Sequence, residues 1–266
     1  MEISRRNFLT TAVVLTSTRL LAQAQTPASA GAADPKLVED LIAANRILAQ
    51  EGIVDAFGHV SMRHDKNPNR YILSRSLAPG IVTPEDLIEY DLDSNAVNAR
   101  GRAQYSERFI HGEIYKARPD VRSVAHSHSP SVIPFGVSSV PLRPVYHLAA
   151  FIGDGLPIFD IRKAAGMTDM LVNDAARGRA LAQTLGNKPA LLMRGHGMVA
   201  VGPAIPYAVG RSVYLELNAK IQIQAVSLGG QVTYLDPEEA RKVVDAGENR
   251  GYERPWEIWK KRAFGQ

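Results

Sequence analysis

The sequence contains no cysteine among its 266 residues. That absence excludes disulfide bonds, thiolate metal sites and a cysteine nucleophile, so any transition metal must be bound by His, Asp or Glu. The sequence also has no internal repeat, and its Lys and Arg residues form no basic block. The formal net charge is only +4, and three cations and one acid lie in the first 24 residues, which leaves +2 for the rest. This charge gives no reason to expect a nucleic-acid partner.

The first 24 residues are typical of an export signal. Two arginines at 5–6 precede an apolar stretch over 8–22, and residues 22–24 form an A-x-A cleavage site, with 28–30 as a second candidate. The arginine pair resembles a twin-arginine (Tat) signal, which predicts export of the folded protein to the periplasm. An ordinary secretory signal or an uncleaved anchor is the alternative, although the apolar stretch is short and interrupted for a membrane span. No other segment is long and apolar enough, so we expect no stable membrane span.

The rest of the sequence favours a single α/β domain over residues 35–266. Its composition, 45% hydrophobic and 22% charged for the whole chain, is that of an ordinary globular protein. Residues 25–34, rich in Ala, Pro, Ser and Gly, are predicted to be a flexible lead-in. The expected helices cover 35–51 with Asp34 as N-cap, a turn at 83–87, 107–116 with Ser106 as N-cap, and 207–228. Alternating or apolar runs predict strands at 59–63, 71–74, 88–92, 121–126, 191–193 and 198–201.

Two histidines two residues apart are the strongest local signal for a metal. His126 and His128 follow an apolar run, and on an extended chain residues i and i+2 project from the same face. Two imidazoles presented together can bind one ion through bonds of about 2.0–2.1 Å. Two histidines brought together by chance in a loop are the alternative interpretation.

His196 and Glu107 are candidates to complete this site. His196 lies between Gly195 and Gly197, which permit a tight turn and close approach of other groups. Beside the histidine pair it would supply the third ligand of a three-histidine site, which leaves a coordination position open as catalytic metals do. Glu107 is a candidate ligand, general base or both in turn. Alternatively, it is a favourable acid in the first turn of a helix.

Two further histidines have less specific surroundings. His111 lies four residues after Glu107, on the same face of the expected helix. It either orients Glu107 or packs in the interior. His64 precedes a polar loop, and we expect it at the solvent-exposed surface.

Together these residues resemble the class II aldolase/adducin family, which includes fuculose-phosphate aldolase and ribulose-phosphate 4-epimerase. The resemblance extends from about Asp34 to Gly230 and rests on short motifs in the same order. The matching segments are 58–63, 83–87, 91–93, 106–107, 111, 115–120, 124–130 and 194–197.

This resemblance implies a fold, a cofactor and an assembly. The fold is a three-layer α/β/α sandwich around a mostly antiparallel sheet. His126, His128 and His196 would bind one divalent metal ion per subunit, with zinc or manganese as first candidates, and Glu107 would transfer the proton. The family also implies a homotetramer with active sites at subunit contacts and a small-molecule substrate.

The sequence departs from the sugar-phosphate members at the positions that bind phosphate in them. His59 replaces an Asn, Arg75 and Ser76 stand where a Ser-Gly pair is expected, and Tyr105 replaces the first residue of a Ser-Ser pair. Arg is suited to bidentate binding of a carboxylate, and Tyr and His to a planar ring. We therefore expect a carboxylated, non-phosphorylated substrate, with an aromatic ring as one option. The candidate substrate-binding residues are Arg75, His59, Ser76, Tyr105 and His147, the last in a proline-rich stretch equally typical of a stiff loop.

The predicted activity is metal-dependent decarboxylation or aldol cleavage, a carbon–carbon lyase reaction. Both reactions form a carbanion, whose charge a divalent metal stabilises. The altered pocket resembles that of the family branch containing hydroxy-aromatic and pyridine-dicarboxylate decarboxylases. Glu107 would deliver or remove the proton, and Arg75 would orient the carboxylate. A sugar-phosphate aldolase or 4-epimerase and a non-catalytic adducin-like binding module are the alternatives.

Overall fold

Seven strands form one sheet in the order β3-β2-β1-β4-β7-β6-β5. All neighbours pair antiparallel except β5 and β6, which are parallel. The computed structural model describes residues 28–266, without the side chains of 248–251. The strands are β1 (His59–Arg63), β2 (Arg70–Ser74), β3 (Leu87–Asp91), β4 (Ser123–Ser127), β5 (Ile158–Phe159), β6 (Ala190–Met193) and β7 (Gly197–Gly202). The predicted mostly antiparallel sheet is confirmed.

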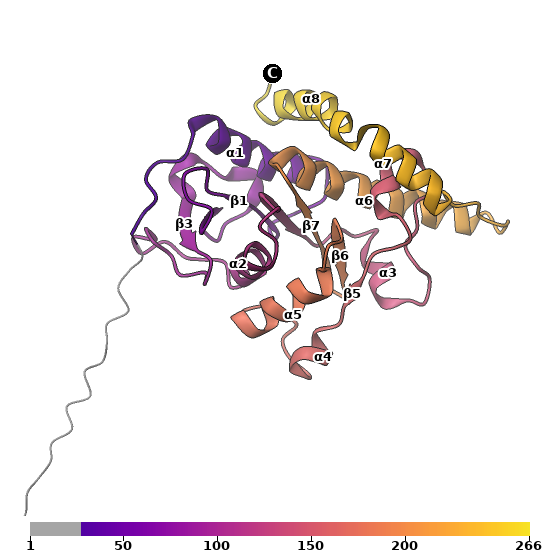
Figure 1. The fold of residues 1–266 in the computed structure, drawn as a ribbon, viewed down its shortest axis with the longest axis horizontal. Helices are drawn as coiled ribbons and strands as arrows, with labels where there is room; N and C mark the ends of the chain where they lie inside the picture. The colour runs from indigo at the N-terminus through magenta and orange to yellow at the C-terminus, as the bar shows by residue number, and fades with distance from the viewer. Residues whose placement is uncertain (1–27) are drawn as a thin grey trace, which may run out of the picture.

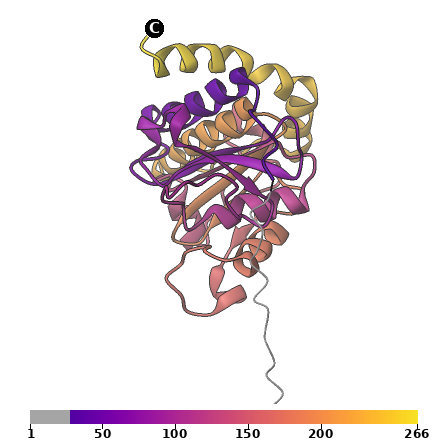
Figure 2. The same ribbon diagram turned by 90° about the vertical axis from the view of Figure 1, so that its left-hand side faces the viewer.

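Helices cover both faces of this sheet and make three layers (Figures 1 and 2). On one face lie α1 (Pro35–Gln50) and α6 (Ile205–Ser227), with α8 (Glu253–Ala263) outside them; on the other lie α2 (Arg108–Ala117) and α5 (Ala175–Leu185). The remaining α-helices are α3 (Ile133–Val137), α4 (Ile161–Ala165) and α7 (Pro237–Gly251). Three short 3-10 helices complete the described elements: η1 (Pro79–Ile81), η2 (Pro84–Asp86) and η3 (His147–Ile152). The α/β/α sandwich expected from the resemblance is therefore present.

The two faces of the sheet have separate hydrophobic cores. Val60 and Met62 of β1 pack with α1 and α6, whereas Val124 of β4 packs with α2. Because successive strand residues point to opposite faces, His59 of β1 and His126 of β4 point to the α2 face. The sheet therefore turns its histidines toward the layer that carries Glu107.

Two of the four predicted helix starts are confirmed, and two differ: α2 begins at Arg108 rather than 107, and α6 at Ile205 rather than 207. The Asp34 side chain accepts a hydrogen bond from the Lys36 amide, and Pro35 begins α1. Thr83 and η2 form a capping box. The N-cap of α2 is Glu107, not Ser106. The Glu107 carboxylate makes no cap hydrogen bond, because it is turned toward groups elsewhere in the fold.

Residues 28–34, the described part of the predicted lead-in, have no helix or strand but are held on β3 by polar contacts. Ser29 Oγ and the Ala30 amide donate to the buried Glu89 carboxylate at 2.5 and 2.8 Å. The Gly31 carbonyl lies 3.0 Å from His64 Nε2. His64 is only 1% exposed, so the prediction of a solvated surface residue is wrong. This segment covers its ring, an arrangement that the polar loop after His64 does not reveal.

These contacts predict that a chain lacking residues 1–30 is less stable than one lacking residues 1–24. The shorter truncation keeps every contact of Ser29 and Ala30, whereas the longer one leaves the buried Glu89 carboxylate with fewer donors. Hydrogen bonds to charged groups are worth about 1.5–3 kcal/mol, and we expect a loss of that order in the free energy of unfolding. Urea denaturation of both variants measures it. Equal stabilities would contradict the prediction and would leave cleavage at 28–30 compatible with the fold.

The aromatic C-terminal segment packs on the rest of the domain. Trp259 of α8 is buried, with its ring 5.8 Å from that of Tyr214 on α6. No helix in the described part of the chain combines the length and the apolar character needed to cross a membrane. The predicted export signal at 1–24 lies outside the described residues.

Candidate metal centre and active site

Three histidines and Glu107 converge from different parts of the fold. His126 is in β4, His128 follows it, and His196 lies in the turn between β6 and β7. One ligand atom from each of these residues and from Glu107 lies within 4.8 Å of the others. The Nε2 atoms of His128 and His196 are 3.0 Å apart, and Glu107 Oε2 is 3.5 Å from Nε2 of both His126 and His196. The structure thus brings together the four residues that the sequence predicts for the centre.

Glycine on both sides makes the position of His196 possible. Gly195 has a φ of +65°, a conformation that other residues rarely adopt. A Cβ atom on Gly197 would lie 1.9 Å from the carbonyl oxygen of Ser127, within the β4–β7 pairing. The close approach that the two glycines suggest in the sequence is present, and it places His196 beside the end of β4.

Backbone carbonyls orient two of the histidine rings. Nδ1 of His126 lies 3.0 Å from the Met198 carbonyl, and Nδ1 of His196 lies 3.1 Å from the Met170 carbonyl. A carbonyl only accepts, so each Nδ1 carries a proton and donates it, which in the neutral ring leaves the lone pair on Nε2. Rings held in this way through their second nitrogen are typical of metal ligands.

The buried groups fit a divalent metal. His126 Nε2 is buried and has no hydrogen-bond partner in the described structure, although a lone pair in the interior normally requires one. Burial and the neighbouring His126 and His196 lower the pKa of His128 to about 4, so its ring is neutral at neutral pH. Neutral imidazoles are the form that binds metals. Ligand atoms on a tetrahedral ion with 2.0–2.1 Å bonds are about 3.3 Å apart, close to the separations found here.

Glu107 is held as a carboxylate beside the three histidines. Burial by itself raises the pKa of its carboxyl group, but the imidazoles of His126 and His196 beside it outweigh burial and bring the pKa well below its usual range. One oxygen, Oε1, accepts the Val172 amide at 2.9 Å. The other oxygen, Oε2, faces the imidazoles. The carboxylate is therefore fixed at one end and available at the other.

His111 packs in the interior and contacts His59 instead of Glu107. Its Nε2 lies 2.7 Å from His59 Nδ1, and its Nδ1 lies 2.6 Å from Ser61 Oγ, which is 2.8 Å from the Tyr115 hydroxyl. Burial lowers the pKa of His111 to about 3 and also lowers that of His59, so both rings are neutral. Of the two predicted roles for His111, the structure favours the interior one.

A cavity of about 410 Å³ adjoins the centre. Predicted residues that line it are His59, Ser76, Tyr105, Glu107 and His128. The Tyr105 ring lies 4.4 Å from that of His59, and its hydroxyl donates to the Leu77 carbonyl at 2.5 Å. Tyr105 thus offers the cavity its ring and uses its hydroxyl internally.

Arg75 does not line this cavity, contrary to its predicted role in orienting the substrate. Its Nε donates to Asp86 Oδ1 at 2.6 Å, and the same carboxylate accepts the amide and hydroxyl of Thr83. Burial by itself raises the pKa of Asp86, but these hydrogen bonds, Arg75's first, lower it overall. The Nε of Arg75 is therefore paired with a carboxylate of the same chain, and the Asp86 carboxylate stabilises the turn at η2.

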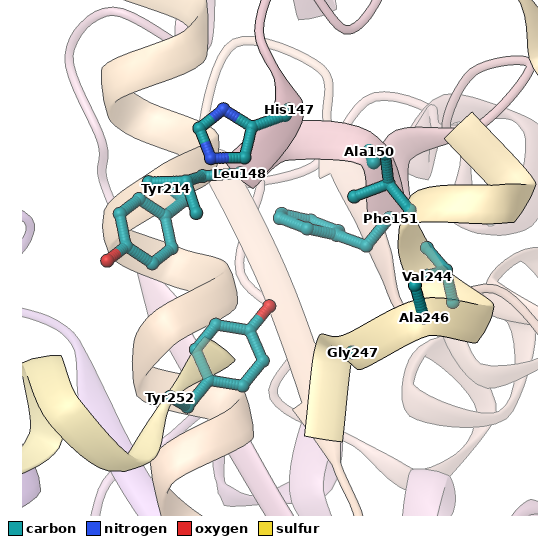
Figure 3. A pocket seen from close by; sticks show the side chains of 10 residues that line it. His147, Leu148, Ala150, Phe151, Tyr214, Val244, Ala246, Gly247 and Tyr252 are labelled. Carbon is teal, nitrogen blue, oxygen red and sulfur yellow. The ribbon is translucent and has the colours of Figure 1, made fainter. Parts of the chain in front are cut away.

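His147 is also outside the cavity within one chain. It is exposed at the start of η3 and faces a separate, largely apolar pocket with Tyr214, Phe151 and Tyr252 (Figure 3). The two pockets share no lining residue among those described. The stiff-loop interpretation of this stretch therefore agrees better with its position than the predicted role in substrate binding.

A loop that completes the site was not predicted from the sequence. Residues 168–173 supply the Met170 carbonyl to His196 and the Val172 amide to Glu107, and Leu171 lines the cavity. These contacts are made by backbone groups, which every residue has, so no residue type marks them. Asp169, Asn173 and Asp174 indicate only a turn.

Comparison with known proteins places the chain among lyases of similar length. The pattern of the family described as "Class II Aldolase and Adducin N-terminal domain" matches residues 39–223. Decarboxylase tropJ of Talaromyces stipitatus is 35% identical over 244 residues, 84% of this chain and 92% of that protein. The 3,4-dihydroxyphthalate decarboxylase of Rhodococcus jostii is 27% identical over 77% of this chain and 86% of its own. The structure of L-fuculose 1-phosphate aldolase from Glaciozyma antarctica superposes with a TM-score of 0.72 at 26% identity, covering 86% of this chain and 90% of that one.

Proposed function

The chain belongs to the class II aldolase and adducin family, and we propose that it is a metal-dependent decarboxylase of a hydroxylated aromatic carboxylic acid. The observation that carries the proposal is the buried cluster of three imidazoles beside a fixed carboxylate, opening on a cavity lined by rings. Two relatives from different organisms that match over most of their length, decarboxylase tropJ and a 3,4-dihydroxyphthalate decarboxylase, are both decarboxylases. The enzyme class is lyase.

The metal that His126, His128 and His196 would hold supplies positive charge, which stabilises negative charge forming on the substrate when the carbon–carbon bond breaks. In the proposed reaction, Glu107 Oε2 accepts the proton of a substrate hydroxyl. The bond to the carboxyl carbon then breaks, CO2 leaves, and its electron pair stays on the ring carbon. Glu107 returns the proton to that carbon, so that one carboxylate acts first as base and then as acid. The rings of His59 and Tyr105, which contact one another, would line one side of the planar substrate.

The cavity argues against the sugar-phosphate alternative. Backbone amides near Ser76 would be natural phosphate donors, but the Ser76 amide donates to the Ala103 carbonyl at 2.9 Å. The next amide, of Leu77, lies 3.5 Å from the Tyr105 hydroxyl. Both amides are engaged within the chain, so a phosphate group would find few donors there.

Three finer features belong to the same proposal. We propose zinc or manganese as the metal, because three imidazoles and a carboxylate accept either ion. We propose a homotetramer with active sites at subunit contacts, and the 64% exposed Phe57 at the edge of the cavity is a residue that such a contact would cover. We also propose export to the periplasm through the arginine pair at 5–6.

A panel of substrates tests the proposal directly. We expect the metal-loaded protein to release CO2 from an ortho-hydroxylated aromatic acid such as 3,4-dihydroxyphthalate, measured by chromatography of the product, and to leave fuculose 1-phosphate unchanged. Cleavage of the sugar phosphate without release of CO2 from any aromatic acid would show that the aldolase alternative is right. Activity that survives removal of all metal would contradict both.

A further inference from the structure

We propose that His59 binds a substrate oxygen as a hydrogen-bond donor through Nε2–H, and that Tyr115, Ser61 and His111 are positioning residues that fix this direction. The inference deepens the proposed function and rests on it for the identity of the ligand. It starts from a continuous line of hydrogen bonds that runs from the core under α2 to the cavity.

Tyr115, at the inner end of this line, determines which atom donates each hydrogen bond. Tyr115 is 1% exposed, and within the described residues its hydroxyl has Ser61 Oγ as acceptor, at 2.8 Å. A buried phenol O–H without an acceptor is unfavourable, so Tyr115 donates to Ser61. The single hydroxyl proton of Ser61 is then free to point to its other neighbour, His111 Nδ1, at 2.6 Å.

The two imidazoles continue the same order of donation, from His111 to His59. His111 is fully buried and neutral, and since its Nδ1 accepts from Ser61, its proton is on Nε2. That Nε2–H donates to His59 Nδ1 at 2.7 Å. His59 is neutral as well, so its own proton is on Nε2, the ring nitrogen left over for the cavity that His59 lines.

The described lining of this cavity has no positively charged donor. Its described lining contains no Lys or Arg, the Arg75 guanidinium is bound to Asp86, and the Tyr105 hydroxyl donates to a carbonyl. Glu107 is an acceptor only. A carboxylate or ring oxygen of the substrate would therefore meet His59 Nε2–H, with the Ser76 and Ser106 hydroxyls as further donors among the lining residues. The neutral donor takes the role that the sequence assigns to Arg75.

The first test reads the protons directly and needs no substrate. Long-range ¹H–¹⁵N NMR of the full, histidine-labelled chain, with and without added zinc, distinguishes protonated from unprotonated ring nitrogens, and His59 and His111 variants assign the signals. We expect protons on Nε2 of both rings. A proton on Nδ1 of His59 would overturn the inference even if the enzyme decarboxylates aromatic acids.

The second test measures binding of 3,4-dihydroxybenzoate to the metal-loaded protein by calorimetry. We expect His59→Leu to weaken binding about tenfold or more, and His59→Gln, which keeps an N–H donor, to recover part of the loss. Ser61→Ala removes the hydroxyl that links Tyr115 to His111. We expect it to weaken binding about threefold or more and to change the His59 tautomer.

Ser94→Ala is the matched control, because Ser94 is also buried and also contacts a buried tyrosine, Tyr71, but no histidine. It should leave binding and the tautomer unchanged. If the unmodified protein binds the probe and His59→Leu binds it equally well, or if Ser61→Ala behaves like Ser94→Ala, the inference is wrong. If the unmodified protein does not bind the probe at all, the choice of ligand in the proposed function fails, and the NMR result still decides the direction of the hydrogen bonds.

Discussion

Replacing Glu107 by Gln is expected to lower kcat by about 10²–10⁴-fold, the usual contribution of a positioned general acid or base. The amide cannot take up and return the proton, yet it has nearly the shape of the carboxylate and can still accept the Val172 amide hydrogen bond. We therefore expect the variant to fold and to bind substrate with little change in KM. Steady-state kinetics with the best substrate of the panel measures both parameters.

Metal content separates two explanations of that loss. If Glu107 acts on the proton, Glu107→Gln retains the metal; if it is an indispensable ligand, the metal is lost together with activity. Glu113→Gln is a matched control, since Glu113 is also buried, belongs to the same helix and forms its ion pairs with Lys116 and Arg179, away from the cluster. Undiminished kcat in Glu107→Gln would falsify the proposed proton transfer.

Replacing His126 by Ala is expected to remove most of the bound metal and to lower activity more than about 100-fold, because changing only the outer partners of metal ligands already costs 10–100-fold. His126 supplies the most enclosed nitrogen of the cluster, and its Nε2 has no other partner in the described structure. Elemental analysis of the purified protein gives metal per chain. Chelation of the unmodified protein should have the same effect, and restoring activity with zinc, manganese, cobalt or iron identifies the ion.

His147→Ala is the control for metal binding. His147 is exposed and faces the separate pocket beside Tyr214, so its loss should leave metal content unchanged (Figure 3). Equal metal content in the His126 and His147 variants would show that the cluster is not the metal site.

The six predicted strands and the start of α1 were predictable because their signals are local, whereas β5, α5, α7 and α8 were not predicted. Asp34 followed by Pro35 marks the start of α1, and the expected strand at 59–63 matches β1. The start of α2 was misplaced by a residue because Ser106 looks like a better cap than Glu107 in sequence. Contacts made across the fold decide that position, since they draw the Glu107 carboxylate away from the helix.

The substrate pocket was less predictable, because a residue type states what a side chain can do but not whether another group already uses it. Arg75 is suited to binding a carboxylate, and in the structure its Nε donates to the carboxylate of Asp86. The Tyr105 hydroxyl is likewise engaged by Leu77. The polar residues that follow His64 in the sequence are typical of the surface, yet the segment at 28–34 buries its side chain.

The sequence by itself determined the chemistry available to this protein: without cysteine, and with His126, His128, His196 and Glu107 in motifs of one family, it specifies a candidate histidine-based metal centre on an α/β sandwich. Only the tertiary structure decided which groups are left free to act. Hydrogen bonds form between neighbours that are distant in sequence, so Arg75 is paired with Asp86 while His59 lines the cavity.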